Sequence, residues 1–159
     1  MMKYSSTPIP VLIREIFLLL ILGIICSCVS GKSQIKAYQN LQTSIQAFND
    51  AFEAKHLENA AAFVQRIARE TFKEEYHHIK KNVTFDEMES MRIELFKNGV
   101  PVTQSGFGPE EDFNEALLTL RHRVVISPSN RVENITVKHR WLKESERWVV
   151  VPNLKPFSK

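Results

Sequence analysis

The last third of the chain alternates apolar and polar residues, which restricts the possible folds more than any other feature of the sequence. Over residues 118–126 and 135–141, apolar side chains alternate with Thr, Lys and Arg, as in strands with one buried face. A tight turn at Glu144-Ser145 then leads into a third apolar segment, 147–151. Consecutive strands joined by short loops pair antiparallel, so this part is predicted to form an antiparallel sheet.

Two segments ahead of these strands have the spacing of amphipathic helices. Apolar residues recur every three or four positions from Ile35 to Phe52, and the pattern resumes from Leu57 to Ile79. Helices followed by antiparallel strands predict an α+β domain in which the N-terminal helices pack on one face of a curved antiparallel sheet.

The segment between the helices and the strands has two interpretations. Thr84 and Glu87 have the spacing of a capping box, which predicts that a helix begins there. Residues 91–106 fit either a continuation of that helix or a β-hairpin around Asn98-Gly99, because Asn-Gly favours two-residue hairpin turns. In both cases Asn98-Gly99 ends an element.

The N-terminal segment has the order of a secretory signal. Lys3 and Arg14 precede an apolar run that begins at Ile16, and small residues follow it. Counted as far as Val29, the run has 14 residues, about 21 Å as a helix against the roughly 30 Å of hydrocarbon in a bilayer. A cleaved signal is therefore favoured over a transmembrane anchor.

The end of this segment, Ile25-Cys26-Ser27-Cys28, resembles the lipobox of bacterial lipoproteins. In that family the cysteine after a small residue is lipidated and becomes the new N-terminus. The resemblance implies Cys28, because Ser27 precedes it whereas the bulky Ile25 precedes Cys26. Several acyl chains on one residue hold a domain stably on a membrane, at about 0.8 kcal/mol per buried CH₂. The alternative is an ordinary cleaved signal followed by a free thiol.

The lipobox also implies a location and a set of boundaries. Cleavage before Cys28 removes 27 of the 159 residues and leaves 132. Val29, where enterobacterial lipoproteins of the inner membrane have Asp, implies a periplasm-facing protein of the outer membrane. The expected parts are a signal peptide (1–27), a lipidated N-terminus with its tether (28–34), the folded domain (35–153) and a C-terminal tail (154–159).

The order of the predicted elements resembles the cystatin-like cone domains. The resemblance rests on the segment from Ala47 to Ala60, which leads into the second helix, and on the hairpin from Trp141 to Trp148. That superfamily includes ketosteroid isomerases and relatives of nuclear transport factor 2, many of them envelope lipoproteins. Its members are enzymes, small-ligand binders or protein-binding modules, so the resemblance implies a fold and no particular activity.

Two histidines interrupt the apolar face of the predicted sheet. With symmetrically closed loops, His122 lies opposite His139 and Trp141 lies beside Trp148. In a cone this face lines a cavity, which makes these four residues candidates for a ligand pocket or for proton exchange in an isomerase-like or hydrolase-like enzyme. The alternative is a pair of partly buried, hydrogen-bonded histidines. Two histidines without a third ligand give little support for a metal site.

The opposite face of the same strands is basic. The predicted register sets Arg121 opposite Arg140 and Arg123 opposite Lys138. Like charges across strands destabilise a sheet, so a bound lipid phosphate or lipopolysaccharide would explain them; a solvated face with splayed side chains is the alternative. The formal net charge of +3 is too small and too scattered to predict a nucleic-acid partner.

The sequence therefore predicts a membrane-anchored envelope lipoprotein whose domain binds a small-molecule ligand or a protein partner without catalysis. Ketosteroid isomerase chemistry requires a carboxylate base and acidic hydrogen-bond donors, and Tyr38, Asp50 and Asp112 do not match those roles. We expect no catalytic residue, no cofactor and no metal. The alternatives are an enzyme that uses His122 and His139, and a basic face that binds lipid phosphate.

Overall fold

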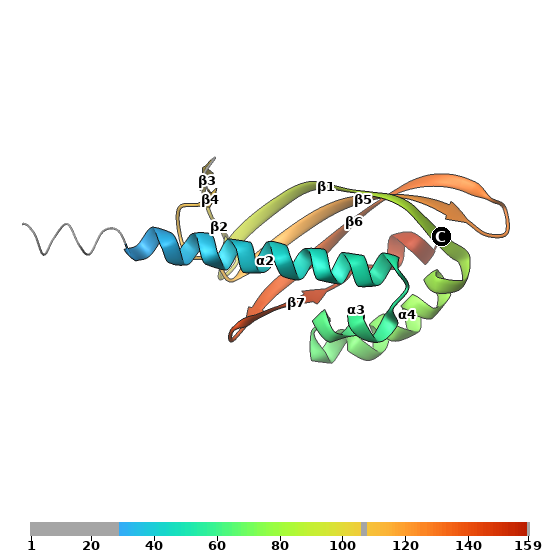
Figure 1. Cartoon of the computed structure of the whole chain (residues 1–159), viewed down its shortest axis with the longest axis horizontal. Helices are drawn as coiled ribbons and strands as arrows, with labels where there is room; N and C mark the ends of the chain where they lie inside the picture. The colour runs from blue at the N-terminus through green and yellow to red at the C-terminus, as the bar shows by residue number, and fades with distance from the viewer. Residues whose placement is uncertain (1–28, 106–107, 159) are drawn as a thin grey trace, which may run out of the picture. The chain divides into compact units, whose positions relative to one another are not determined.

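The computed structural model describes residues 29–105 and 108–158 (Figure 1). The chain divides into two compact units, residues 1–33 and residues 34–159, and the second of them is the α+β domain. The predicted signal peptide and Cys28 lie outside the described residues. Among the described helices, none combines the length and the apolar character that a membrane crossing requires.

The helices come first along the chain and the strands follow. The helical elements are α2 (Val29–Glu53), α3 (Leu57–Phe63), the 3₁₀ turn η1 (Arg66–Ala68), α4 (Arg69–Asn82) and the C-terminal 3₁₀ turn η2 (Lys155–Ser158). The main sheet has the order β2-β1-β5-β6-β7. Its strands are β1 (Val83–Lys97), β2 (Val100–Pro101), β5 (Glu115–Ile126), β6 (Arg131–Glu144) and β7 (Arg147–Val151), and a separate short ribbon consists of β3 (Gln104–Ser105) and β4 (Gly108–Pro109).

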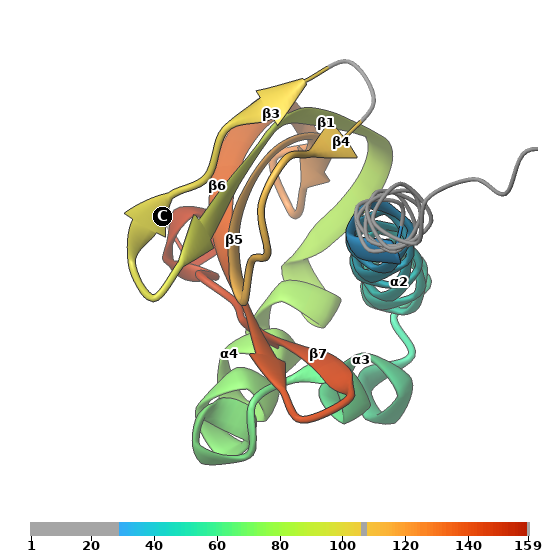
Figure 2. The ribbon, with the colours of Figure 1, turned by 90° about the vertical axis from the view of Figure 1, so that its left-hand side faces the viewer.

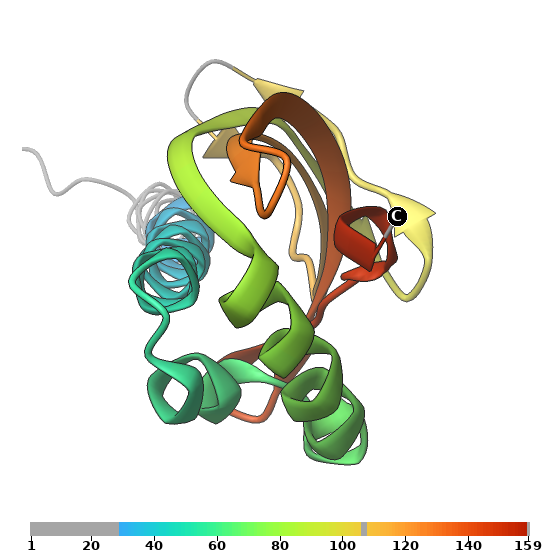
Figure 3. The ribbon, with the colours of Figure 1, turned by 90° about the vertical axis from the view of Figure 1, so that its right-hand side faces the viewer.

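The sheet curves around a core that the helices cover from one side (Figures 2 and 3). Every pairing in the main sheet is antiparallel. The predicted α+β class, with helices on one face of a curved antiparallel sheet, is therefore confirmed. We call the opposite face of the sheet the open face.

The core forms where the apolar stripe of α2 meets the sheet. Leu41, Phe48 and Phe52 are almost completely buried. The ring of Phe48 lies edge-on to Trp141 of β6, with a centroid distance of 5.8 Å. Burying a large apolar side chain contributes about 1.5–3 kcal/mol, so these contacts account for the attachment of α2 to the sheet.

The predicted second helix is interrupted at Val64 and Gln65. Val64 has an extended backbone and forms a parallel bridge with Val150, and the Gln65 N–H donates to the Val150 carbonyl at 2.9 Å. The apolar residues keep their helical spacing in the sequence across this break, because Val64 is buried although its backbone is extended. The break gives the outer edge of β7 a hydrogen-bonded neighbour.

No helix begins at Thr84, so the prediction from the capping box is wrong. Residues Val83–Lys97 form β1, and the Asn98-Gly99 turn joins it to β2. Both turn residues have positive φ, 51° for Asn98 and 80° for Gly99, as a type I′ hairpin turn requires. Of the two interpretations of residues 91–106, the hairpin is confirmed.

Two β-bulges explain why β1 resembles a helix in sequence. They lie between Phe85 and Glu87 and between Ser90 and Arg92, and each adds one residue to the strand. As a result, the core-facing residues of β1 are not spaced strictly two positions apart. These residues are Phe85, Met88, Ile93 and Leu95.

The folded domain extends beyond its predicted end at residue 153. Leu154 and Phe157 are buried, with 1% and 4% of their surfaces exposed. Phe157 packs against Phe52 of α2 and Phe85 of β1. The segment expected to be a C-terminal tail, 154–159, therefore contributes two side chains to the core.

Candidate functional site

The hairpin of β5 and β6 pairs in a different register from the predicted one. His122 lies opposite Ile135, and His139 lies opposite Leu118, so the two histidines do not face each other. The difference arises because residues 131–134 belong to β6 rather than to the loop. The shift is an even number of residues, so both imidazoles remain on the helix-covered face.

His139 is a buried, neutral histidine. It is 1% exposed, and burial, together with the nearby His122, lowers the pKa of His139 to about 3. The backbone N–H of Asn153 donates a hydrogen bond to Nδ1 of His139 at 3.2 Å. At neutral pH His139 therefore acts as a hydrogen-bond acceptor inside the core.

His122 is equally buried but lacks such a partner. It is 1% exposed, and its Nδ1 lies 3.4 Å from Oε1 of Glu53 at the end of α2. Among the described residues, neither ring nitrogen of His122 nor Oε1 of Glu53 forms a hydrogen bond. The rings of Phe85 and Phe157 lie 5.4 and 5.5 Å from the imidazole. Buried polar groups without partners are rare in folded proteins.

The two tryptophans are also part of the core and do not pair directly. Trp141 lies opposite Val150 and Trp148 opposite Lys143, so the predicted pairing is wrong by two residues. Trp148 stacks on Phe113 with a centroid distance of 5.5 Å and an interplanar angle of 20°. Trp141 and Trp148 are 0% and 4% exposed, which places both among core side chains.

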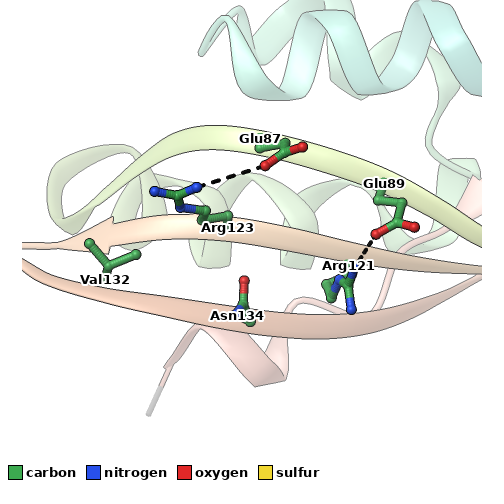
Figure 4. Close-up of a pocket in the computed structure, with 6 residues that line it drawn as sticks. All are labelled: Glu87, Glu89, Arg121, Arg123, Val132 and Asn134. Atoms are coloured by element: carbon green, nitrogen blue, oxygen red, sulfur yellow. Dashed lines mark hydrogen bonds and ion pairs between the residues drawn. The ribbon is translucent and has the colours of Figure 1, made fainter.

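Three of the four predicted cations of the open face, Arg121, Arg123 and Arg140, have opposite charges beside them. Arg121 lies opposite Thr136, and Arg123 lies opposite Asn134, so the predicted pairing of cations is wrong. Arg121 forms an ion pair with Glu89 of the neighbouring β1 (Figure 4).

Arg123 and Arg140 also have carboxylates within reach. Nε of Arg123 lies 3.1 Å from Asp86, and Nη1 of Arg123 lies 3.9 Å from Glu87. Arg140 contacts Glu115 at 2.6 Å. Lys138 lies opposite Thr119. Among the described residues, it forms no ion pair. The carboxylates of β1, Asp86, Glu87 and Glu89, were not predicted as partners because the bulges in β1 obscure which of its residues share a face.

A shallow pocket on the open face lies between these ion pairs. It encloses about 480 Å³, and its charged walls come from β1 and β5 while β6 supplies the remainder (Figure 4). The residues that line it are Glu87, Glu89, Arg121, Arg123, Val132 and Asn134. Within the described ranges, no group of three or more His, Cys, Asp or Glu side chains is arranged to hold a metal ion.

Comparison with known proteins gives one structural similarity. No protein-family model matches the chain, and no curated protein gives a significant sequence match. The fold is similar to a ketosteroid isomerase-like protein from Erwinia carotovora atroseptica SCRI1043, with a TM-score of 0.48 and 13% sequence identity. The alignment covers 70% of this chain and 88% of that chain.

Proposed function

We propose that this protein is a lipid-anchored protein of the bacterial cell envelope whose α+β domain binds a ligand or a protein partner and catalyses no reaction. The N-terminal sequence supports the anchor, and the geometry of the domain weighs against catalysis. The strongest observation against catalysis is the burial of His122 and His139, which are each 1% exposed.

General acid–base catalysis requires a group that reaches its substrate and has a pKa near the working pH. His139 meets neither condition, because it is buried and its pKa is lowered to about 3. Its Nδ1 is also occupied by the N–H of Asn153. These properties support a structural role for His139 and weigh against an isomerase-like or hydrolase-like enzyme that uses it.

The open face supports a role in binding. Its pocket exposes carboxylates and guanidinium groups side by side. A lipid phosphate or lipopolysaccharide would have to displace Glu89 from Arg121 and Asp86 from Arg123, whereas a protein surface with both charges can pair with the existing pattern. Mixed charge of this kind gives an interface specificity and register more than raw affinity.

The anchor is proposed at Cys28. Removal of residues 1–27 leaves Cys28 at the N-terminus of the mature chain, and attached palmitate and diacylglycerol would hold the domain at the membrane surface. Val29 after Cys28 supports the outer membrane, with the domain facing the periplasm.

Labelling with radioactive palmitate in a Gram-negative host tests the anchor. We expect label in the wild type and in Cys26→Ala, which is the matched control, and none in Cys28→Ala. Globomycin, which blocks the lipoprotein signal peptidase, should cause a precursor to accumulate. Label that survives Cys28→Ala, or a chain insensitive to globomycin, would overturn the proposal.

A further inference from the structure

We propose that the outer edge of β1, from Val83 to Arg92, is a docking site for an extended segment of a partner protein that alternates basic and apolar residues and joins the main sheet as a further strand. This inference rests on the proposed binding function and names the chemistry of the partner and the way in which it binds. It does not depend on the lipid anchor.

Only one of the two edges of β1 is paired along its length. β5 pairs with β1 from Val83 to Phe96, whereas β2 pairs with it at Phe96 and Lys97 alone. In the described part of the chain, no strand lies beside the outer edge of β1 between Val83 and Arg92. This stretch is long enough for a whole added strand, since strands of about five or six residues are common.

Hydrogen bonds near β2 show which residues of β1 direct their backbone groups outward. The Val102 N–H donates to the Leu95 carbonyl at 2.9 Å, and Nε2 of Gln104 donates to the Ile93 carbonyl at 3.2 Å. Ile93 lies opposite Leu118 of β5. Because both bulges lie in β1, every second residue of β5 after Leu118 has an outward-directed residue opposite it. These outward-directed residues are Phe85, Met88 and Ser90.

The open-face side chains of this edge are acidic. The carboxylates of Asp86, Glu87 and Glu89 are each more than half exposed, and they outnumber Arg121 and Arg123, which pair with them from β5 (Figure 4). An added strand would lie on the other side of β1 from these arginines, so its own open-face side chains would flank Glu87 and Glu89. Opposite charges on neighbouring strands stabilise their pairing, which favours Lys or Arg at these positions of the partner.

The helix-covered face of the same edge is apolar. Phe85 and Met88 are partly buried and pack against the core. Successive residues of a strand point to opposite faces, so apolar residues between the basic ones would extend this packing. A segment that alternates basic and apolar residues therefore matches both faces of the edge.

The same edge of a second copy of this chain is a poorer partner. Pairing of two β1 edges would set Glu87 and Glu89 of one copy beside those of the other on one face, and like charges across strands are destabilising. Bulges and charged side chains also protect natural sheets from edge-to-edge association. A separate extended segment can follow the bends at the bulges, whereas the edge of a preformed sheet cannot.

The test titrates the purified full-length protein with the synthetic peptide Thr-Val-Lys-Val-Lys-Val-Thr, capped at both ends, and with the same peptide carrying Glu in place of Lys. The Lys peptide should slow hydrogen exchange of the amides of Phe85, Met88 and Ser90 and should bind at least about tenfold more tightly than the Glu peptide. Absence of Lys-peptide binding, equal binding of the two peptides, or protection confined to other segments would overturn the proposal.

Methylated peptides separate strand addition from simple charge attraction. The N–H groups of the Val residues and those of the Lys residues lie on opposite edges of an extended peptide, and only one of these edges can face β1. Methylation of the nitrogens on one edge should therefore abolish binding, and methylation on the other edge should leave it unchanged. Equal binding of the two methylated peptides would overturn the proposal.

Substitutions in β1 locate the site. Ser90→Pro removes an outward N–H, a change that an edge strand tolerates, and should weaken binding of the Lys peptide about tenfold without altering the circular dichroism. Glu87→Lys combined with Glu89→Lys should reverse the preference, so that the Glu peptide binds more tightly. The matched control is Glu70→Lys combined with Glu74→Lys, which changes the net charge equally at exposed positions of α4 and should leave the preference unchanged.

The outcomes distinguish this inference from the anchor. An unchanged preference in the β1 double variant, or a reversed preference in the α4 control, would overturn the proposal. If either β1 variant fails to fold, the methylated peptides decide. Absence of Lys-peptide binding by a palmitate-labelled protein would overturn this inference and leave the anchor intact.

Discussion

The backbone N–H of Asn153 donates a hydrogen bond to Nδ1 of His139 at 3.2 Å, inside the core and away from solvent. This bond ties the C-terminal segment to β6. It also requires His139 to be neutral, because a protonated imidazole has no acceptor. His139, which the sequence makes a candidate for proton exchange, is therefore a structural hydrogen-bond acceptor.

The neutral state of His139 predicts a pH-dependent stability. The pKa of His139 is lowered from 6.5 to about 3 in the folded protein, so between these values the unfolded chain binds more protons. Stability therefore falls as the pH drops from 6.5 towards 3, by up to about 1.4 kcal/mol per pH unit from this residue. Urea unfolding at pH 7 and pH 4.5 should show a smaller loss for His139→Gln than for the wild type, and no such difference for exposed His77→Gln.

Phe48 is expected to be among the most sensitive core positions. It is 0% exposed and contacts Phe72, His139 and Trp141. Phe48→Ala should lower the free energy of unfolding by about 3–5 kcal/mol, measured by chemical denaturation. Ile67→Ala is the control, because Ile67 is 88% exposed and should change stability by less than about 0.5 kcal/mol. Similar losses for the two variants would contradict the described packing of α2.

Tyr76 should contribute through a single buried hydrogen bond. Its hydroxyl donates to the carbonyl of Phe52 at 2.7 Å, and burial raises the pKa of Tyr76 to about 12. Tyr76→Phe removes this hydrogen bond, while the Phe52 carbonyl still accepts the N–H of Lys55 at 3.2 Å, and it should cost about 0.5–1.5 kcal/mol of unfolding free energy. For Tyr38, whose hydroxyl has no hydrogen bond among the described residues, Tyr38→Phe should be nearly neutral. An equal effect of the two substitutions would argue against the bond.

The ion pair between Arg121 and Glu89 should stabilise the sheet only slightly. Both side chains are about half exposed, 47% and 55%, and exposed pairs typically contribute about 0.2–1 kcal/mol. A double-mutant cycle with Arg121→Gln and Glu89→Gln should give a coupling energy of about that size that declines as NaCl is raised from about 0.05 to about 1 M. A coupling that is absent at low salt would mean that Arg121 is free for an external anion, as the lipid-phosphate alternative requires.

The sequence was informative where one face of an element is buried and the other is solvated. The stripe predicted the buried side of α2 from Tyr38 to Phe52, while its first residue, Ile35, is 46% exposed. The alternation over 118–126 predicted the core face of β5. Both histidines were placed on the correct face for the same reason, since strand alternation is independent of the exact register when the error is even.

The errors arose where that contrast is weak. Residues 131–134 are largely polar and exposed, so no alternating apolar pattern marks them as part of β6. The loop was therefore predicted too long, and the predicted pairing of β5 with β6 was shifted. The bulges in β1 gave a helical spacing to a strand. The burial of Phe157 and the proximity of Glu53 to His122 depend on tertiary contacts between segments far apart in the sequence, which local patterns do not encode.

The proposal that the protein is a lipid-anchored envelope protein is tested most directly by the mass of the N-terminal tryptic peptide of the mature protein. The proposal predicts a peptide of residues 28–32 that begins at Cys28 and carries the mass of attached acyl chains. An unmodified Cys28, a mature chain that begins after residue 28, or a chain that retains the apolar run before Cys26 would contradict it.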